Sequence, residues 1–342
     1  MRIKCISILL LIFGAVSAQT TVNPDISVIG ELGLSYEDDV FGMNASSVEL
    51  AIQGYVNPYA RADVYLHKHM DDEPIELEEA VLTIERGLPL GLALRAGKFR
   101  PGFGKINGEH MHLAPYILIP EPVAQILGEE KWASAGLEVK WLLPLPWYSD
   151  LALAYLQDGI TAGAHHYDAD EHEHVEDSTP ALSTRLSMFF DLGTVSHLEL
   201  GASYYQVSEK PEQNMLGIDL KYKWRPDKYT TLDWQTELFR RSAYTHLDEG
   251  EEEDNPEVIA IYSMLDFQFK KRWNAGFIAD YSSSLDDENY QSNGLFFGYS
   301  PAEETTVFRM FFKQENHGNE PATLKVEGQL LWSLGPHKAH QF

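Results

Sequence analysis

The sequence has almost no cysteine: a single residue, Cys5, occurs in 342. Cys5 opens the apolar run CISILLLIFGAV, which two basic residues precede and small residues follow. Because this arrangement is typical of a secretory signal peptide, we predict that residues 1–18 are cleaved and that residues 19–342 form a single domain. The mature chain would then contain no cysteine, which excludes a disulfide framework.

Positive charge is also scarce. The chain has 26 Lys and Arg residues against 52 Asp and Glu residues, a formal net charge of −26. Such an acidic chain repels nucleic acid and attracts cations, so we predict no nucleic-acid partner. Long apolar runs are missing as well, because after the predicted signal peptide no run reaches the roughly eighteen residues of a membrane-spanning helix.

Familiar enzyme motifs are missing too. No G-x-S-x-G occurs, and GFGKIN is not a phosphate-binding loop because Ile106 stands where a Ser or Thr would bind magnesium. We therefore predict no enzymatic activity. A Ser/His arrangement assembled across strands is the enzymatic alternative.

What the sequence has in abundance is alternation of apolar and polar residues with period two. In NMLGIDLKYKW, Leu216, Ile218 and Leu220 share one face, whereas Asp219 and Lys221 share the other. Short connections rich in Pro, Gly, Asn and Asp alternate with longer polar links. The alternating segments number sixteen, at about 25–36, 47–56, 59–69, 75–86, 91–99, 134–143, 147–156, 181–191, 196–207, 213–224, 230–244, 257–269, 273–283, 290–300, 305–314 and 321–334.

This pattern predicts an all-β fold, a transmembrane antiparallel β-barrel of about 16 strands, apolar outside and polar inside, with short periplasmic turns and long outer loops. The outer loops would include residues 37–46, 157–180, 245–256 and 284–289. A soluble β-sandwich is the alternative. Tryptophan favours the barrel, because six of the seven lie near strand ends beside short turns, where a membrane interface would be. These six are Trp141, Trp147, Trp224, Trp234, Trp273 and Trp332.

Several stretches resemble a known family. They are VNPYARADVYL, ELEEAVLTIERGLPLGLALRAGKFRPGFGKIN, KWRP, LDWQTELFRR and the C-terminal SLGPHKAHQF. Together they are similar to porin-like outer-membrane proteins, related to phosphate-selective porins and often labelled zinc-regulated. The resemblance implies a barrel in the outer membrane of a Gram-negative bacterium, and the terminal Phe342 resembles the end that the barrel-assembly machinery recognises. It implies no particular transported solute.

Alternation also predicts which charged side chains face the lumen. Mixed charge in a narrow channel can orient a small polar solute, and the alternative is that these residues only pair with one another. The candidate pore-lining residues are Arg61, Asp63, Glu79, Arg95, Glu138, Lys140, Arg185, Asp219, Lys221, Asp233, Glu237 and Arg309.

The connection over residues 100–133 is too long and too apolar for an exposed hairpin loop, since it contains HLAPYILIPEPVAQILG. We predict that it folds into the barrel as a constriction loop. An apolar lid or a subunit contact is the alternative.

Histidine is concentrated in the predicted outer regions, above all in AHHYDADEHEHVED within the loop at 157–180. Imidazole and carboxylate are ligands that suit Zn(II) or a similar divalent cation, and residues i and i+2 of an extended chain point to the same side. A solvated acidic surface without metal is the alternative. The candidate metal ligands are His165, His166, Asp168, Asp170, His172, His174, His110, His112, His67 and His69.

We therefore predict an outer-membrane channel for passive diffusion of small hydrophilic solutes or ions. The alternative function is a metal-binding uptake component that uses its histidine-rich loops. No cofactor is required, although Zn(II) or another divalent cation is the ligand expected at the loops. Outer-membrane lipid and lipopolysaccharide are the expected surroundings, and a homotrimer is an open alternative to a monomer.

Overall fold

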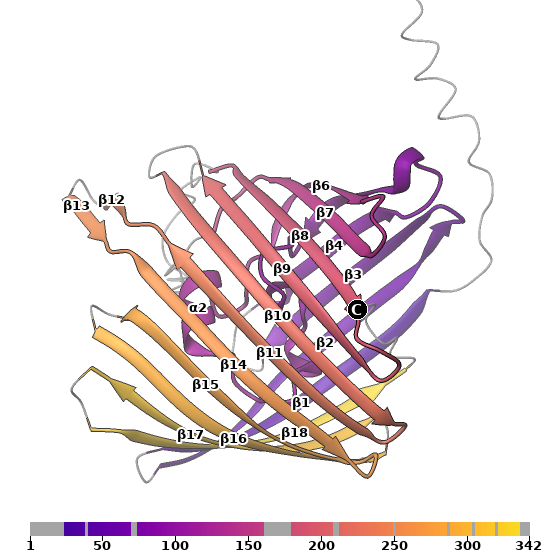
Figure 1. Cartoon of the computed structure of the whole chain (residues 1–342). Helices are drawn as coiled ribbons and strands as arrows, with labels where there is room; N and C mark the ends of the chain where they lie inside the picture. The colour runs from indigo at the N-terminus through magenta and orange to yellow at the C-terminus, as the bar shows by residue number, and fades with distance from the viewer. Residues whose placement is uncertain are drawn as a thin grey trace, which may run out of the picture.

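Most of the chain forms β-strands, and sixteen of those described close into one antiparallel barrel (Figure 1). The structure is a computed structural model that describes residues 24–37, 40–69, 74–160, 179–207, 212–248, 251–285, 288–302, 305–318 and 321–335. The barrel strands are β1 (Asp25–Glu37), β2 (Val40–Asn57), β3 (Ala60–His69), β4 (Glu76–Ile84), β5 (Leu92–Phe99), β6 (Ser134–Leu142), β7 (Tyr148–Leu156), β8 (Ala181–Asp191), β9 (Ser196–Val207), β10 (Gln213–Asp227), β11 (Thr230–Arg241), β14 (Val258–Phe269), β15 (Trp273–Leu285), β16 (Glu288–Ala302), β17 (Thr306–His317) and β18 (Thr323–Leu334).

Each barrel strand pairs with its neighbours in barrel order, and β1 closes the ring against β18, with Val28 opposite Leu334. The predicted alternation is confirmed in this ring. On β10, Ile218 is 57% exposed and lies opposite Leu238, whereas Asp219 is 6% exposed and lies opposite Glu237. Apolar side chains therefore face outward and polar ones inward, which is the reverse of a soluble core.

The predicted tryptophans fit this outward face. Trp141, Trp147, Trp234, Trp273 and Trp332 are all exposed, and Trp224 is half-buried. The seventh, Trp132, is buried at 4% exposure. It belongs to the inward segment described below.

Three predicted loops differ from the structure. The links predicted at 37–46 and 284–289 are wrong, because β1 and β2, like β15 and β16, are separated by only two residues. Most of the loop predicted at 245–256 is a separate hairpin of β12 (Tyr244–Asp248) and β13 (Glu251–Asn255). Backbone hydrogen bonds do not depend on side-chain polarity, so strand pairing continues past the apolar band that marked the strands in the sequence.

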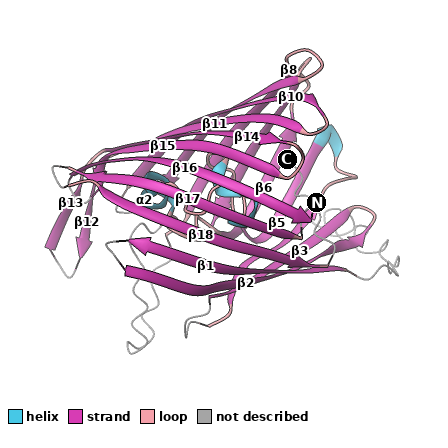
Figure 2. Ribbon diagram, turned by 90° about the horizontal axis from the view of Figure 1, so that it is seen from below, coloured by secondary structure: helices cyan, strands magenta, loops and turns pink. Residues whose placement is uncertain are grey.

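Residues 100–133, between β5 and β6, lie inside the barrel. They contain the short 3-10 helices η3 (Ile106–Gly108) and η4 (Met111–Leu113) and the helix α2 (Glu121–Leu127). Helix α2 packs against β14 and β15, and it lies within the ring of strands in both Figure 1 and Figure 2. We call residues 100–133 the inward segment. No helix among the described residues is long and apolar enough to cross a membrane.

The inward segment packs against inward-facing apolar residues of the wall, and together they form the buried apolar core. Phe103 stacks on Phe239 of β11 with ring centroids 5.7 Å apart, and Trp132 meets Tyr205 of β9 edge-on at 5.0 Å. Val123, on α2, is 1% exposed. Burying one large apolar side chain stabilises a fold by about 1.5–3 kcal/mol, so several such contacts hold the segment against the wall. Its apolar composition is thereby explained.

Candidate functional site

The first turn of the inward segment is built on one buried carboxylate of the barrel wall. Glu237 of β11 is 1% exposed, and it accepts hydrogen bonds from the backbone N–H groups of Lys105 (2.7 Å) and Ile106 (2.9 Å). Gly104 makes this turn with φ of +62°, and a Cβ there would lie 2.5 Å from Glu237 Oε2. The sequence FGKIN therefore uses its glycine for close approach to the wall and not to bind phosphate.

Further contacts tie the inward segment to other parts of the wall. Ser183 Oγ on β8 donates to the carbonyl of Gly102 at 3.0 Å, and Lys105 Nζ pairs with Glu199 of β9. On β17, Arg309 donates to the carbonyl of His112 at 2.8 Å. The segment thus contacts well-separated strands of the ring and crosses the lumen.

Most of the predicted pore-lining residues meet an oppositely charged partner on the wall. Arg185 binds Asp219 through two bonds of 2.6 and 2.8 Å. Arg95 lies 2.9 Å from Glu138 and 3.8 Å from Glu79. The other pairs are Arg61 with Asp63 (2.7 Å), Lys140 with Glu138 (3.8 Å), Lys221 with Glu109 of the inward segment (3.9 Å), and Lys223 with Asp233 (3.5 Å).

A cavity of about 270 Å³ lies between the inward segment and the first strands of the barrel. Its lining carries charge of both signs from several strands, including Arg61, Asp63, Glu79, Arg95 and Lys140. From the inward segment, Gly108 and His110 complete it. Five predicted pore-lining residues therefore border one polar space.

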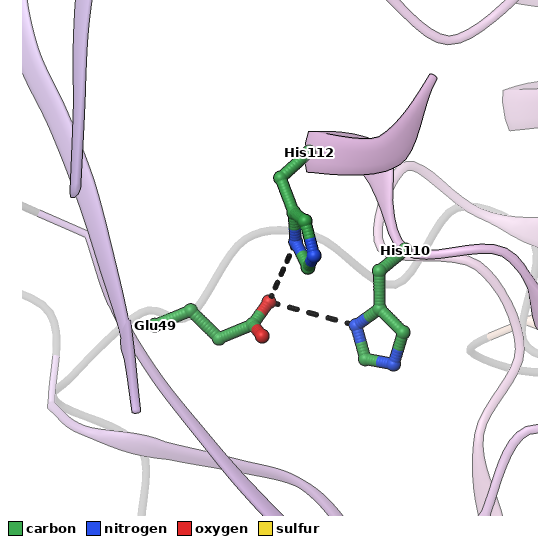
Figure 3. A group of neighbouring side chains, drawn as sticks. All are labelled: Glu49, His110 and His112. Carbon is green, nitrogen blue, oxygen red and sulfur yellow. Dashed lines mark ion pairs between the residues drawn. The ribbon is translucent and has the colours of Figure 1, made fainter. Parts of the chain in front are cut away.

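Two histidines of the inward segment meet a carboxylate of the wall beside this cavity (Figure 3). Glu49 Oε2, on β2, lies 3.5 Å from His110 Nδ1 and 3.3 Å from His112 Nδ1. His110 is 4% exposed and Glu49 9%. We call Glu49, His110 and His112 the inner cluster.

Other charges surround the inner cluster. Glu78 and Glu79 of β4 approach His110 at 3.8 and 3.4 Å, and Arg100 lies 3.4 Å from its Nδ1. Burial alone would lower the pKa of His110, but the contacts with Glu49 and Glu79 outweigh burial and raise the pKa above the ordinary histidine value. The cluster therefore attracts positive charge.

Lys131 holds the far end of the inward segment. Its Nζ donates to the carbonyls of Ile106 (3.2 Å) and Glu109, and the side chain is 6% exposed. Burial, reinforced by the nearby Arg100 charge, lowers the pKa of Lys131 to about 7.

A second group lies toward the outer end of β3. His67 and His69 have ring centroids 4.4 Å apart, and His69 Nε2 lies 3.3 Å from Glu130 of the inward segment. One ligand atom from each of these three residues lies within 4.8 Å of the others. His67 Nδ1 also lies 3.6 Å from Glu78, the residue that approaches His110. We call His67, His69 and Glu130 the outer cluster.

The four predicted metal ligands among the described residues fall into two pairs. His110 and His112 belong to the connection that was predicted to fold into the barrel, and they lie inside the barrel beside Glu49. His67 and His69 lie at the C-terminal end of β3, and their assignment to the outer side stays a prediction. The remaining six predicted ligands, His165, His166, Asp168, Asp170, His172 and His174, lie outside the described residues.

Sequence reasoning missed the carboxylates that complete both clusters. Alternation along β2 placed Glu49 on the polar face, but nothing in the sequence shows which wall the inward segment meets. Glu130 stands in no recognisable motif. The feature that identifies both clusters is an acidic residue opposite two histidines spaced i, i+2. This feature can be recognised only when the fold is known.

Comparison with known proteins agrees with this fold. No protein-family model matches the sequence. A protein of Aquifex aeolicus (strain VF5), described as uncharacterized, is 30% identical over 255 residues, which cover 69% of this chain. The chain spans about half the length of that relative, 53%.

Solved structures of outer-membrane proteins share the architecture. A loop L8 deletion mutant of Vibrio cholerae OmpT matches with a TM-score of 0.60 and 10% identity over 91% of this chain and 99% of that one. The anion-selective porin of Comamonas acidovorans gives 0.58 and 8%, covering 91% and 100%. The outer membrane channel DcaP of Acinetobacter baumannii gives 0.57 and 11%, covering 92% and 99%. At these identities the likeness shows the fold, a closed antiparallel barrel of outer-membrane porin type.

Proposed function

We propose that this chain is an outer-membrane channel for passive diffusion of small hydrophilic solutes or ions. The observation that carries the proposal is the inward segment, which crosses a closed barrel and leaves a polar cavity bordered by charges of both signs. A barrel of this strand number encloses more space than wall side chains can fill, so a folded segment inside it sets the passage. Residues 100–133 would then act as the constriction loop.

The proposal also includes the membrane in which the channel lies. An outward apolar face with exposed tryptophans suits a lipid bilayer, and the similar solved structures are outer-membrane proteins. We place the chain in the outer membrane of a Gram-negative bacterium, after removal of residues 1–18, with lipopolysaccharide around its outer end. Phe342 would be read by the barrel-assembly machinery. One solved OmpT structure is a trimer form, and a homotrimer is part of the proposal.

Charge in the cavity favours ions and polar solutes over apolar ones, because an apolar solute would have to displace water from paired charges there. The resemblance of the sequence to phosphate-selective porins leads us to include anions among the proposed solutes. Arg61, Arg95 and Lys140 are the described cations of the cavity that could attract an anion.

Planar-bilayer recording tests the channel. The mature chain, refolded in detergent and inserted into a bilayer, should produce stepwise conductance in potassium chloride, and a salt gradient should give its ion selectivity. Heat-modified migration on gels shows beforehand that the barrel has formed. A folded barrel that never raises conductance would refute the proposal.

The outer cluster favours a second candidate function, uptake of a divalent metal ion. His67, His69 and Glu130 offer two imidazoles and a carboxylate at the end of the barrel where the long loops lie. Together with the histidine-rich loop at 157–180, they would concentrate the ion at the entrance. Zn²⁺ flux into liposomes containing the protein tests this, with His67→Ala/His69→Ala as the variant. A flux equal to that of empty liposomes would exclude it.

A further inference from the structure

We propose that Glu49, His110 and His112 form a binding site for a divalent transition-metal ion, which joins the inward segment to the barrel wall beside the cavity. The ligands come from two parts of the chain, β2 and the turn around η4. A metal held there would be separate from any ion that the outer cluster or the loop at 157–180 attracts.

The two distances from Glu49 suit such an ion. Ligand atoms about 2.0–2.1 Å from a tetrahedral zinc ion lie about 3.3 Å from one another. Glu49 Oε2 lies 3.3 Å from His112 Nδ1 and 3.5 Å from His110 Nδ1. Dashed lines mark these two pairs in Figure 3. All three residues offer ligand atoms within 4.8 Å of one another, so three protein ligands surround one small space.

A fourth ligand is within reach. Glu78 Oε2 lies 3.8 Å from His110 Nδ1, and it is buried without a hydrogen-bond partner among the described residues. Water from the adjoining cavity could take the position instead. Two imidazoles with one or two carboxylates form a ligand set for Zn²⁺, Co²⁺, Ni²⁺ or Cu²⁺, whereas Mg²⁺ and Ca²⁺ prefer oxygen ligands alone.

Arg100 lies beside His110 and Glu78, at 3.4 and 3.3 Å, but the Glu49 carboxylate has no Lys or Arg partner of its own among the described residues. Within the part of the chain that the structure describes, the Glu49 carboxylate is paired only with the two histidines, and no Lys or Arg lies within 4.0 Å of it. Its Oε1 is buried and has no hydrogen-bond partner there. A buried carboxylate with an unused oxygen is costly, and a bound cation would remove that cost.

Glu79 contacts the other ring nitrogen of His110. His110 Nε2, the nitrogen that faces away from Glu49, lies 3.4 Å from Glu79 Oε1. A ligating histidine usually donates its other ring N–H to a carboxylate, which fixes the tautomer and the orientation of the ring. Arg95 lies 3.8 Å from the other oxygen of Glu79 and so holds that carboxylate in turn.

Bound metal would change the ion selectivity of the channel. His110 borders the cavity that Arg61, Arg95 and Lys140 also line, so a divalent ion adds positive charge to that space. This consequence rests on the proposed channel function. We expect the metal to shift ion selectivity toward anions.

Zn²⁺ titration of the full mature chain, purified in detergent and followed by calorimetry, tests the site. The parent for the experiment carries His165→Ala, His166→Ala, His172→Ala and His174→Ala, so that these loop histidines do not contribute. Glu49→Gln changes the wall and His112→Ala changes the inward segment, and circular dichroism verifies that each variant folds. His67→Ala/His69→Ala, which removes the outer cluster, is the matched control.

We expect the parent to bind one Zn²⁺ at micromolar concentration in the inner cluster, Glu49→Gln and His112→Ala to weaken that binding at least about tenfold, and the control to retain it. A parent without this binding, or either ligand variant with parental affinity, would overturn the proposal. In bilayers with a potassium chloride gradient, Zn²⁺ should shift the reversal potential of the parent toward the equilibrium potential of chloride. It should leave the reversal potential of Glu49→Gln unchanged.

The two proposals fail separately. A protein that conducts but neither binds Zn²⁺ nor changes its selectivity keeps the channel and loses the metal site. One that binds Zn²⁺ through Glu49 and His112 but never conducts keeps the site and loses the channel. Binding without a shift in reversal potential would refute the effect on selectivity.

Discussion

Replacing Glu237 with Gln should release the start of the inward segment from the wall. Three donors converge on Glu237 Oε1: the Ile106 N–H (2.9 Å), the Tyr262 hydroxyl (2.5 Å) and the Gln235 amide (3.3 Å). The amide oxygen of the variant is needed at that position. Its NH₂ group must then face the Lys105 N–H, which now donates to Oε2 at 2.7 Å.

The cost follows from that geometry. The variant loses the hydrogen bond from the Lys105 N–H and sets two buried donors against each other, which together cost about 2–4 kcal/mol. Since about 1.4 kcal/mol is a factor of ten, the ratio of released to docked segment should rise roughly 30- to 900-fold. The barrel itself should remain folded, because its strand pairing is unchanged.

Trypsin digestion and single-channel recording both measure this release. Lys105 is a trypsin site within the turn, so Glu237→Gln should be cut there faster than the wild type and should show larger or noisier conductance. Glu199→Gln is the matched control: it also removes a partner of Lys105, but that ion pair is about a quarter exposed on the Glu199 side, 23%, and contributes less than about 1 kcal/mol. Wild-type digestion and conductance in Glu237→Gln, or a larger effect in the control, would refute the anchoring role.

Three further substitutions test the turn of the inward segment, the outward face of the barrel and an ion pair of the inward face. Gly104→Ala should also loosen the inward segment, by about 1–3 kcal/mol of backbone strain, whereas Gly108→Ala, whose added Cβ meets nothing within 4 Å, should not; equal trypsin sensitivity of the two variants would contradict this. Ile218→Arg places a charge on the outward face and should lower the free energy of unfolding of the barrel by about 2–4 kcal/mol, measured by urea titration in lipid. Lys221→Arg, on the inward face of the same strand, is the control and should change it very little. Asp219→Asn leaves Arg185 without its carboxylate and should cost about 3–5 kcal/mol in the same assay. A cost below about 1 kcal/mol would mean that lumen water already screens this pair.

The barrel could be predicted because the signal for it is local. Whether Ile218 or Asp219 meets lipid depends on the alternation of a few neighbouring residues, and sixteen such segments repeat that signal. The same local signal failed at the outer ends of the strands. There the sequence is polar throughout, as in β12 and β13, so it gives no alternation even though the backbones pair.

The inner cluster could not be predicted because its geometry depends on long-range packing. The apolar composition of residues 100–133 requires burial somewhere, and in a barrel whose outward face meets lipid the lumen is one place that satisfies it. The composition does not say which wall receives which residue. That choice is made by contacts such as Phe103 on Phe239 and Glu237 on the N–H of Ile106, which fix one side of the segment and thereby turn His110 and His112 toward Glu49 on the opposite wall. Loosening the first contact should therefore weaken the second, even though the residues lie on different strands.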